Sequence, residues 1–267
     1  MTVPFDFTGA VVCVTGGGRG VGRTLAQRFA AAGAHVVVNY FRDRAAAEDT
    51  LAAITERGGS AEAVRASVAR REGVDRLFDR VEAAHGRLDV LVCNAASGAF
   101  RPLAELSEKD WARAVDTNLR GALWCARRAA PLMPSGGAIV TLSSSGASRP
   151  LRDYAAIGVS KAAVEALTRY LALEYGPRGI RVNAASAGPL ESDAIRMFPR
   201  AEELAEAAVA STPLGRLGTA ADLADLVLFL ASPSAGWITG QTVLADGGLS
   251  VGAGALGALA GGRFEVG

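Results

Sequence analysis

The sequence predicts one α/β domain, a doubly wound parallel sheet of about seven strands with helices on both faces. Three observations support this fold class. Short runs rich in Val, Ile and Ala alternate with longer Ala-, Leu- and Arg-rich stretches of helical period, which is typical of βαβ units. No Pro- or Ser-rich linker divides the 267 residues. A glycine-rich segment also joins the first predicted strand to the first predicted helix.

The predicted elements follow one another in a regular order. Strands are expected at 10–15, 35–40, 61–66, 88–93, 138–142, 180–184 and 242–245. Helices are expected near 20–32, 44–57, 71–85, 107–133, 154–176 and 219–231. The segment near 190–216 interrupts this order with three prolines and one short Glu/Ala-rich helix, so we interpret it as a substrate lid on a domain that spans 1–250. Residues 251–267 form a tail rich in Gly and Ala.

Charge and hydropathy exclude several classes of function. The 28 basic and 27 acidic residues give a net charge of +1, which is no electrostatic footprint for nucleic acid or an anionic membrane. No apolar run reaches the roughly 18 residues of a membrane span. The first ten residues lack the basic and apolar regions of a signal peptide. We therefore expect a cytoplasmic protein without nucleic-acid or membrane partners.

Neither the cysteines nor the histidines suggest a metal site. Cys13, Cys93 and Cys125 have no metal-like spacing and are expected to be free thiols. His35 begins a predicted strand and His85 ends a predicted helix, and neither has acidic or cysteine neighbours in a ligand pattern. We therefore expect no bound metal.

The glycine-rich segment has the pattern of a phosphate-binding loop. Gly16, Gly20 and Gly22, with Arg19 and Val21 between them, lie between the first strand and the first helix. Glycine lets the backbone turn tightly and approach a pyrophosphate, whose charge is stabilised by the helix N-terminus. Because the strand–loop–helix context is present, the segment predicts a dinucleotide cofactor.

The end of the second strand indicates which dinucleotide is bound. An acidic residue there would hold the ribose 2′-hydroxyl of NAD, but residues 39–44 have no acid directly at the end of the strand. Arg19, with Arg42 or Arg44, could instead bind a 2′-phosphate. This favours NADPH over NADH. Asp43 argues against a phosphate, and Arg44 alternatively belongs to a solvated helix start.

Motifs in a fixed order along the chain resemble the short-chain dehydrogenase/reductase family over about 8–250. They are the glycine loop at 15–22, Asn94-Ala95-Ala96, Asn118, the serines Ser143, Ser144 and Ser145, and Lys161. Members usually carry Tyr-x3-Lys, but position 157 here is Ile157 and the tyrosine is Tyr154. Tyr-x6-Lys looks most like enoyl-acyl-carrier-protein reductase III, an NADPH-dependent subgroup. The resemblance implies a Rossmann-like fold.

The resemblance also implies catalytic roles. Tyr154 would donate to the enolate oxygen of the substrate, while Lys161 would hold the nicotinamide ribose and favour the anionic phenol. Ser144 would bind the substrate carbonyl, although Ser143 and Ser145 remain alternatives. Asn118 would support a water near the lysine. Alternatively, Asn118 is a buried amide that the backbone satisfies.

Further cofactor contacts are implied in the same way. Asn94 and Ala95 match the loop beneath the adenosine ribose and nicotinamide. Ser67 and Val68 stand where the family usually has Asp-Val against the adenine. Gly188 and Ser192 match the segment around the nicotinamide amide, although Ala187 replaces the family's proline.

We therefore expect NADPH-dependent reduction of the 2,3 double bond of an enoyl thioester, in fatty-acid or polyketide biosynthesis. The substrate would be a small molecule or a carrier-bound acyl group, with acyl carrier protein as a candidate partner. A ketoreductase or alcohol dehydrogenase acting on a polyketide or another small carbonyl compound is the main alternative. A non-catalytic NADPH-binding regulatory module is a third hypothesis. A homotetramer assembled through the two long helices is implied by the resemblance alone.

Overall fold

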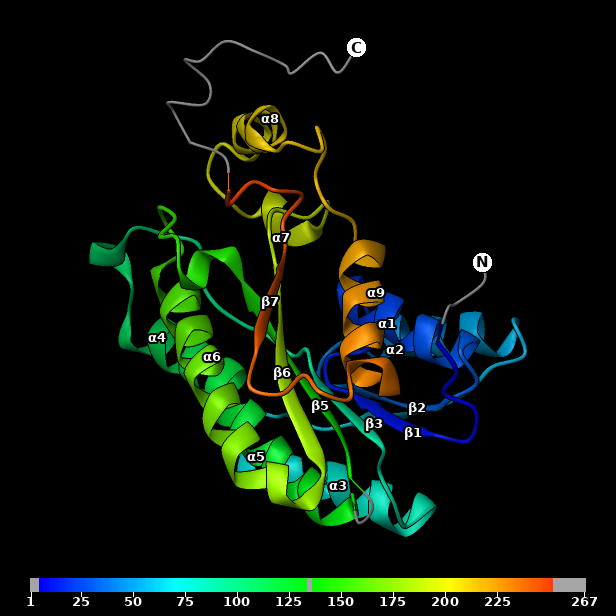
Figure 1. The fold of residues 1–267 in the computed structure, drawn as a ribbon. Coiled ribbons are helices and arrows are strands. Elements are labelled where there is room, and N and C mark those ends of the chain that lie inside the picture. The colour runs from blue at the N-terminus through cyan, green and yellow to red at the C-terminus, as the bar shows by residue number, and fades with distance from the viewer. Residues whose placement is uncertain (1–4, 134–135, 252–267) are drawn as a thin grey trace, which may run out of the picture.

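A seven-stranded parallel sheet organises the chain, in the order β3-β2-β1-β4-β5-β6-β7 (Figure 1). The computed structural model describes residues 5–133 and 136–251. The strands are β1 Val11–Val14, β2 His35–Tyr40, β3 Ser60–Arg65, β4 Val90–Cys93, β5 Gly137–Ser144, β6 Ile180–Ala187 and β7 Thr242–Ala245. This architecture confirms the predicted α/β class.

Helices cover both faces of the sheet because the central strands are apolar on both sides. In β1, Val12 and Val14 pack on the side of α1 and α9, whereas Val11 and Cys13 face α3, α5 and α6. Such two-sided burial is typical of parallel sheets. The helices are α1 Gly20–Ala31, α2 Arg44–Thr55, α3 Arg71–His85, α4 Glu108–Ala114, α5 Gly121–Ala129, α6 Ala155–Tyr175, α7 Asp193–Arg196, α8 Ala201–Ser211 and α9 Ala220–Ala231.

The structure differs from the sequence prediction in three places. The helix expected over 107–133 is divided, because a wider π-helical turn at Val115–Arg120 separates α4 from α5. The strands β5 and β6 extend to Ser144 and Ala187, beyond the predicted ends at 142 and 184. The segment near 190–216 holds two helices, α7 and α8, instead of one.

The carboxyl ends of the strands form the candidate site. The chain order reverses between β1 and β4, which are neighbours in the sheet, and ligands of open α/β sheets bind at such switch points. The segment that carries α7 and α8 lies beyond the carboxyl ends of β6 and β7 (Figure 1). Among the described helices, none is long and apolar enough to cross a membrane. Residues 252–267 of the predicted tail lie outside the described residues.

Candidate active site

The glycine loop between β1 and α1 needs its glycines for specific reasons. Gly16 and Gly20 have φ of 64° and 53°, a backbone region that disfavours other residues. A Cβ at Gly22 would lie 2.1 Å from the Gly16 carbonyl oxygen and 2.6 Å from Asn94 Nδ2. Arg19 precedes α1, and no side chain caps that helix. The first N–H groups of α1 are therefore available to an anion.

Asn94 and Ala95 fasten the end of β4 to this loop. The Asn94 side-chain amide donates to the carbonyl oxygens of Thr15 and Gly16 at 2.9 and 3.0 Å. The backbone N–H groups of Asn94 and Ala95 donate to Thr15 Oγ1 at 3.0 and 3.1 Å. The two residues therefore lie beside the glycine loop, where the sequence predicted a cofactor contact.

Sequence reasoning did not identify Asn39, which organises the same region. Its side chain is buried at the end of β2. Asn39 Oδ1 accepts from the Gly16 N–H at 3.3 Å, while Nδ2 donates to the carbonyl oxygens of Val64 and Ala66 at 3.2 and 3.0 Å. The signal was present, since Asn39 is an amide that directly follows three valines in the strand sequence HVVVNY.

The charged residues after β2 differ in their partners. Asp43 caps α2, with its Oδ1 accepting from the Ala46 N–H at 3.0 Å, so its carboxylate is engaged by the helix. Arg44 pairs with Glu48 at 2.7 Å, as its solvated interpretation predicted. The Arg42 guanidinium lies 5.9 Å from the centre of the Phe41 ring. Arg42 therefore remains open to a ligand in the part of the chain that the structure describes.

Ser67 and Val68, two further predicted cofactor residues, follow the carboxyl end of β3. Ser67, which follows β3, lines a cavity of about 420 Å³ together with Phe41, Arg65 and Arg70. Val68 is buried against the core.

Val21 packs partly buried against the core in the first turn of α1. Gly188 follows β6, where a Cβ would lie 2.7 Å from the Cβ of Asp246. Ser192 Oγ donates to the Leu190 carbonyl oxygen at 3.3 Å. Gly188 and Ser192 thus form the start of the segment leading to α7.

Tyr154 immediately precedes α6 and lies in an aromatic cluster. Its ring stacks on Phe198, with centroids 5.6 Å apart and an interplanar angle of 21°, and lies 5.8 Å from the Phe100 centroid. The rings of Phe100 and Phe198 are themselves 4.6 Å apart. Gly146 lies against the same ring, because a Cβ there would be 2.6 Å from Tyr154 Cε1. Packing on several sides therefore fixes the phenol.

This packing also sets the protonation state of the phenol. Burial raises the pKa of Tyr154 above its usual value, and the neighbouring Ser144 hydroxyl acts in the opposite direction with a smaller effect. Tyr154 is therefore a neutral hydrogen-bond donor at neutral pH. The expected role of Lys161, which is to favour the anionic phenol, stays a prediction.

Lys161 lies within α6, two turns after Tyr154, as the spacing predicted. Its ammonium group is buried and donates to the Leu142 carbonyl oxygen in β5 at 2.7 Å. Burial lowers the pKa of Lys161 to about 8. The side chain is thus anchored at the carboxyl end of β5 and carries a charge at neutral pH.

The structure distinguishes two of the three candidate serines. Ser143 Oγ donates to Glu165 Oε1 at 2.6 Å, which directs this side chain toward α6. Ser144 Oγ accepts from the Gly146 N–H at 3.2 Å and lies next to Tyr154. Ser144 is therefore the better placed of the two to act with the phenol.

Asn118 lies in the π-helical turn, and both polar atoms of its amide form hydrogen bonds with protein groups. Its Oδ1 accepts from the Ser97 N–H at 2.8 Å, and its Nδ2 donates to the Ser97 carbonyl oxygen and to Ser160 Oγ at 3.0 and 2.9 Å. This geometry matches the alternative interpretation of a buried amide. Asn118 links the loop after β4 to α6 and so positions the helix that carries Lys161.

The expectation that His35 and His85 lack an acidic neighbour is wrong. His35 and His85 do have an acidic partner, because both approach Glu62 of β3, with His85 Nε2 at 2.8 Å from Glu62 Oε1. The three residues are distant in sequence and meet only through strand pairing and the packing of α3.

Comparison with known proteins identifies the family. A family model described as "Enoyl-(Acyl carrier protein) reductase" matches residues 16–250. The 1-cyclohexenylcarbonyl-CoA reductase of Streptomyces collinus is 43% identical over 243 residues, which cover 90% of this chain and 87% of the relative. This chain belongs to the short-chain dehydrogenase/reductase family.

Other members of the family are also similar to the chain. The 3beta-hydroxysteroid dehydrogenase 1 of Eggerthella lenta is 40% identical, over 92% of this chain and 95% of the relative. A solved structure of a mutated Serratia marcescens short-chain dehydrogenase/reductase has a TM-score of 0.86 at 34% identity, covering 92% of this chain and 99% of that one. A Mycobacterium ulcerans short-chain type dehydrogenase/reductase has a TM-score of 0.85 at 32% identity, covering 92% and 91%.

Membership of the family makes this short-chain dehydrogenase/reductase an NAD(P)H-dependent oxidoreductase. The hypothesis of a non-catalytic regulatory module gives way to an enzyme. The residues present fit a nicotinamide dinucleotide. The uncapped start of α1 can accept a pyrophosphate, and a Cβ at Gly20 would meet no atom within 4 Å, so the loop is open on that side.

Proposed function

We propose that this enzyme uses NADPH to reduce the 2,3 double bond of an enoyl thioester. One observation carries the proposal. Tyr154 immediately precedes α6 and lies seven residues before Lys161, instead of the four residues of the family's usual Tyr-x3-Lys, which is a shift of about one helical turn. Its ring packs against Phe100 and Phe198. The apolar surroundings suit a conjugated acyl chain. The similarity to a 1-cyclohexenylcarbonyl-CoA reductase supports the same reaction class.

The side chains of the site have complementary roles in this reaction. A bound nicotinamide cofactor would supply the hydride that the β-carbon of the enoyl group receives. Negative charge would then develop on the thioester oxygen. Neutral Tyr154 donates a hydrogen bond to that oxygen, and Ser144 can donate a second one. Such donors lower the barrier because they are already oriented toward the developing charge. A proton from solvent would then add at the α-carbon and complete the reduction.

Ile157 explains how the shifted tyrosine is accommodated. This residue occupies the position where most members carry their tyrosine, and it is buried. A Cβ at Gly98 would lie 2.1 Å from Ile157 Cγ1, so Ile157 packs closely on the loop after β4. The polar group is thereby displaced by one helical turn, toward the aromatic cluster.

Reduction of a carbonyl is the second candidate function. A neutral phenol beside a serine can also donate to the oxygen of a ketone, and the geometry of Tyr154 and Ser144 serves that reaction as well. The similarity to a hydroxysteroid dehydrogenase and to a hydroxynaphthalene reductase-like protein of Metarhizium robertsii favours this candidate. The two reactions differ in where the hydride is added, so product analysis separates them.

We propose NADPH as the preferred cofactor because of Arg42 and Arg19. Loss of a charge-assisted hydrogen bond costs about 1.5–3 kcal/mol, which is a factor of roughly 10 to 150 in affinity. We expect Arg42→Ala to reduce the preference for NADPH over NADH by that factor. Arg44→Ala is the matched control, because Arg44 is paired with Glu48. If Arg42→Ala and Arg44→Ala changed the ratio of NADPH to NADH affinity by the same factor, the proposed contact of Arg42 with the 2′-phosphate would be contradicted.

The proposed reaction also suggests a pathway, a location and a partner for the enzyme. An enoyl thioester reductase would act in fatty-acid or polyketide biosynthesis in the cytoplasm, with acyl carrier protein as a candidate partner. We also propose a homotetramer that assembles through the long helices, including α6.

The proposed reaction can be tested by following NADPH oxidation. Enoyl thioesters, β-ketoacyl thioesters and ketones serve as substrates, and the products are identified by mass spectrometry. We expect saturated thioesters as products, with activity strongly reduced in Tyr154→Phe and in Ser144→Ala. Ser143→Ala is the matched control, because Ser143 donates to Glu165 instead. Turnover of ketones alone would contradict the proposal.

A further inference from the structure

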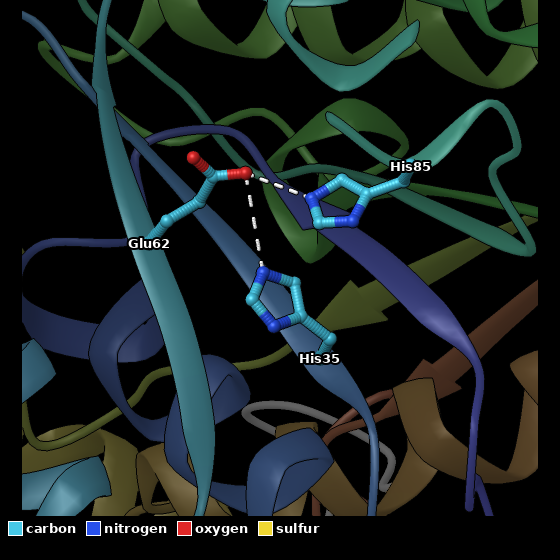
Figure 2. Close-up of side chains that lie close together, drawn as sticks. All are labelled: His35, Glu62 and His85. Atoms are coloured by element: carbon cyan, nitrogen blue, oxygen red, sulfur yellow. Dashed lines mark hydrogen bonds and ion pairs between the residues drawn. The ribbon is translucent and has the colours of Figure 1, made fainter. Parts of the chain in front are cut away.

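Both histidines of the chain meet at one carboxylate (Figure 2). His85 Nε2 lies 2.8 Å from Glu62 Oε1, and His35 Nε2 lies 3.9 Å from the same oxygen. These three atoms all lie within 4.8 Å of one another. The side chains come from β2, β3 and the last residue of α3.

The architecture of the sheet brings these residues together. His35 pairs with Ser60 and Val37 pairs with Glu62 in the parallel register of β2 and β3. Side chains two residues apart point to the same face of a strand, so His35 and Glu62 share a face with Val37. Val37 packs in the cluster that includes residues of α3, and His85 ends that helix.

The ring of His35 is held at one nitrogen, which leaves the other nitrogen for a ligand. Its Nδ1 lies 2.7 Å from Ser60 Oγ, which fixes the ring. Its Nε2 is buried and has no hydrogen-bond partner within the described residues. Ser60 thus acts as the kind of outer partner that orients ligating histidines.

Glu62 presents one carboxylate oxygen to the histidines and the other to Arg80. Arg80 donates to Glu62 Oε2 from Nε and Nη2 at 2.9 and 2.7 Å. Glu62 Oε1 is therefore the oxygen that faces both imidazoles.

We propose that His35 Nε2, Glu62 Oε1 and His85 Nε2 bind one divalent transition-metal ion of the zinc class. Metal–ligand bonds of about 2.0–2.1 Å in a tetrahedron place neighbouring ligand atoms roughly 3.3 Å apart. The two distances to Glu62 Oε1, 2.8 and 3.9 Å, bracket that value. The three side chains keep 18–29% exposure, although His35 Nε2 itself is buried, and water would fill the fourth position.

The ion would have a structural role. His35 and Ser60 begin their strands, whereas the glycine loop follows the carboxyl end of β1, so the two sites lie at opposite ends of the sheet. The ion would join β3, which is the edge strand, to β2 and to the end of α3. The negative end of the α3 dipole also favours a cation there.

The experiment uses the full chain without an affinity tag, stripped of metal by a chelator. Co²⁺ is titrated while the visible absorption of tetrahedral Co²⁺ is recorded, and bound Zn²⁺ is counted by mass spectrometry after dialysis. We expect about one ion per chain and a higher Tm with Zn²⁺. Reductase turnover should be the same with and without the chelator.

Variants identify the ligands. Glu62→Gln and His85→Gln should abolish stoichiometric binding, and Ser60→Ala should weaken it by about 10- to 100-fold, since it removes only the outer partner. Glu72→Gln, an exposed residue of α3, is the matched control. Circular dichroism of the metal-free proteins checks that each variant folds. If the ligand variants do not fold, the weaker binding expected for Ser60→Ala provides the test. Absence of stoichiometric binding to the wild-type chain, or its full retention in Glu62→Gln, would overturn the proposal.

Discussion

The phenol of Tyr154 lies in the space that a side chain at position 146 would need. A Cβ there would be 2.6 and 2.7 Å from two atoms of the ring. Real contacts are not this short, so the ring would have to move. The absence of a side chain at Gly146 is thus as important for the candidate site as the presence of the phenol.

Substitution of this glycine is therefore expected to affect activity more than stability. We predict that Gly146→Ala lowers kcat/KM by about a hundredfold, because misplacement of a reacting group by about 1 Å has an effect of that size. Gly176→Ala is the matched control, since its φ of −53° suits alanine and no atom lies within 4 Å of the added Cβ. Steady-state kinetics and thermal melts test both variants. Equal activity in the two would contradict the role of Gly146.

The protonation of Lys161 predicts a pH dependence. Its pKa of about 8 means that the ammonium is charged below that pH and neutral above it. Tyr154 stays neutral over the same range, because burial raises its pKa. We therefore expect kcat/KM to fall as the pH rises through about 8. In Lys161→Arg this fall should be absent, since the guanidinium stays charged. A profile that is flat in the wild-type enzyme would contradict the prediction.

At the scale of elements, the segment between β6 and α9 carries Phe198 to the catalytic side chains. Phe198 lies between α7 and α8, yet its ring stacks on Tyr154 and contacts Phe100. This contact supports the interpretation of the segment as a substrate lid. The sequence identified the segment from its prolines, but its periodicity did not reveal the short helix α7, which has only four residues.

We predict that removal of the Phe198 ring weakens substrate binding. Burial of such a ring contributes about 1.5–3 kcal/mol, so Phe198→Ala should raise the KM for an enoyl thioester by roughly tenfold or more. Leu214→Ala is the matched control, because Leu214 is 69% exposed in the same segment. Initial rates over a range of substrate concentrations measure both effects. An unchanged KM in Phe198→Ala would remove the evidence for a lid.

The hydrophobic period of the sequence predicted which main helices and strands exist and in what order. It did not predict where a helix is interrupted. The period of 107–133 is helical throughout, so nothing in it signals the π-helical turn at Val115–Arg120. Tertiary contacts stabilise that turn, since Asn118 forms hydrogen bonds with Ser97 and Ser160. Local propensity cannot indicate partners that lie so far away in the sequence.

At the scale of the whole molecule, the doubly wound parallel sheet was predictable from βα alternation, and the phosphate loop from its glycines. The meeting of His35, Glu62 and His85 was not, because it depends on strand register and on the packing of α3. The same limit applies to Asn39, whose partners belong to the glycine loop and to β3 and its end.

An exposed apolar face of α6 predicts that the protein forms an oligomer. Tyr170 and Leu173 lie three residues apart on α6, so they share one face, and they are 74% and 78% exposed. Exposed apolar side chains that lie together are typical of interfaces. We predict a solution mass near four times 27.3 kDa by light scattering, and smaller species for Leu173→Glu. A monomeric wild-type chain would contradict the proposed tetramer.

The proposed reaction is tested most directly by one ratio. This is kcat/KM with NADPH for an enoyl thioester divided by kcat/KM for the β-ketoacyl thioester of the same chain length on the same carrier. Reduction of the 2,3 double bond predicts a ratio well above one, with a saturated acyl thioester as product. A ratio well below one, with a hydroxyacyl product, would contradict the account and favour a ketoreductase.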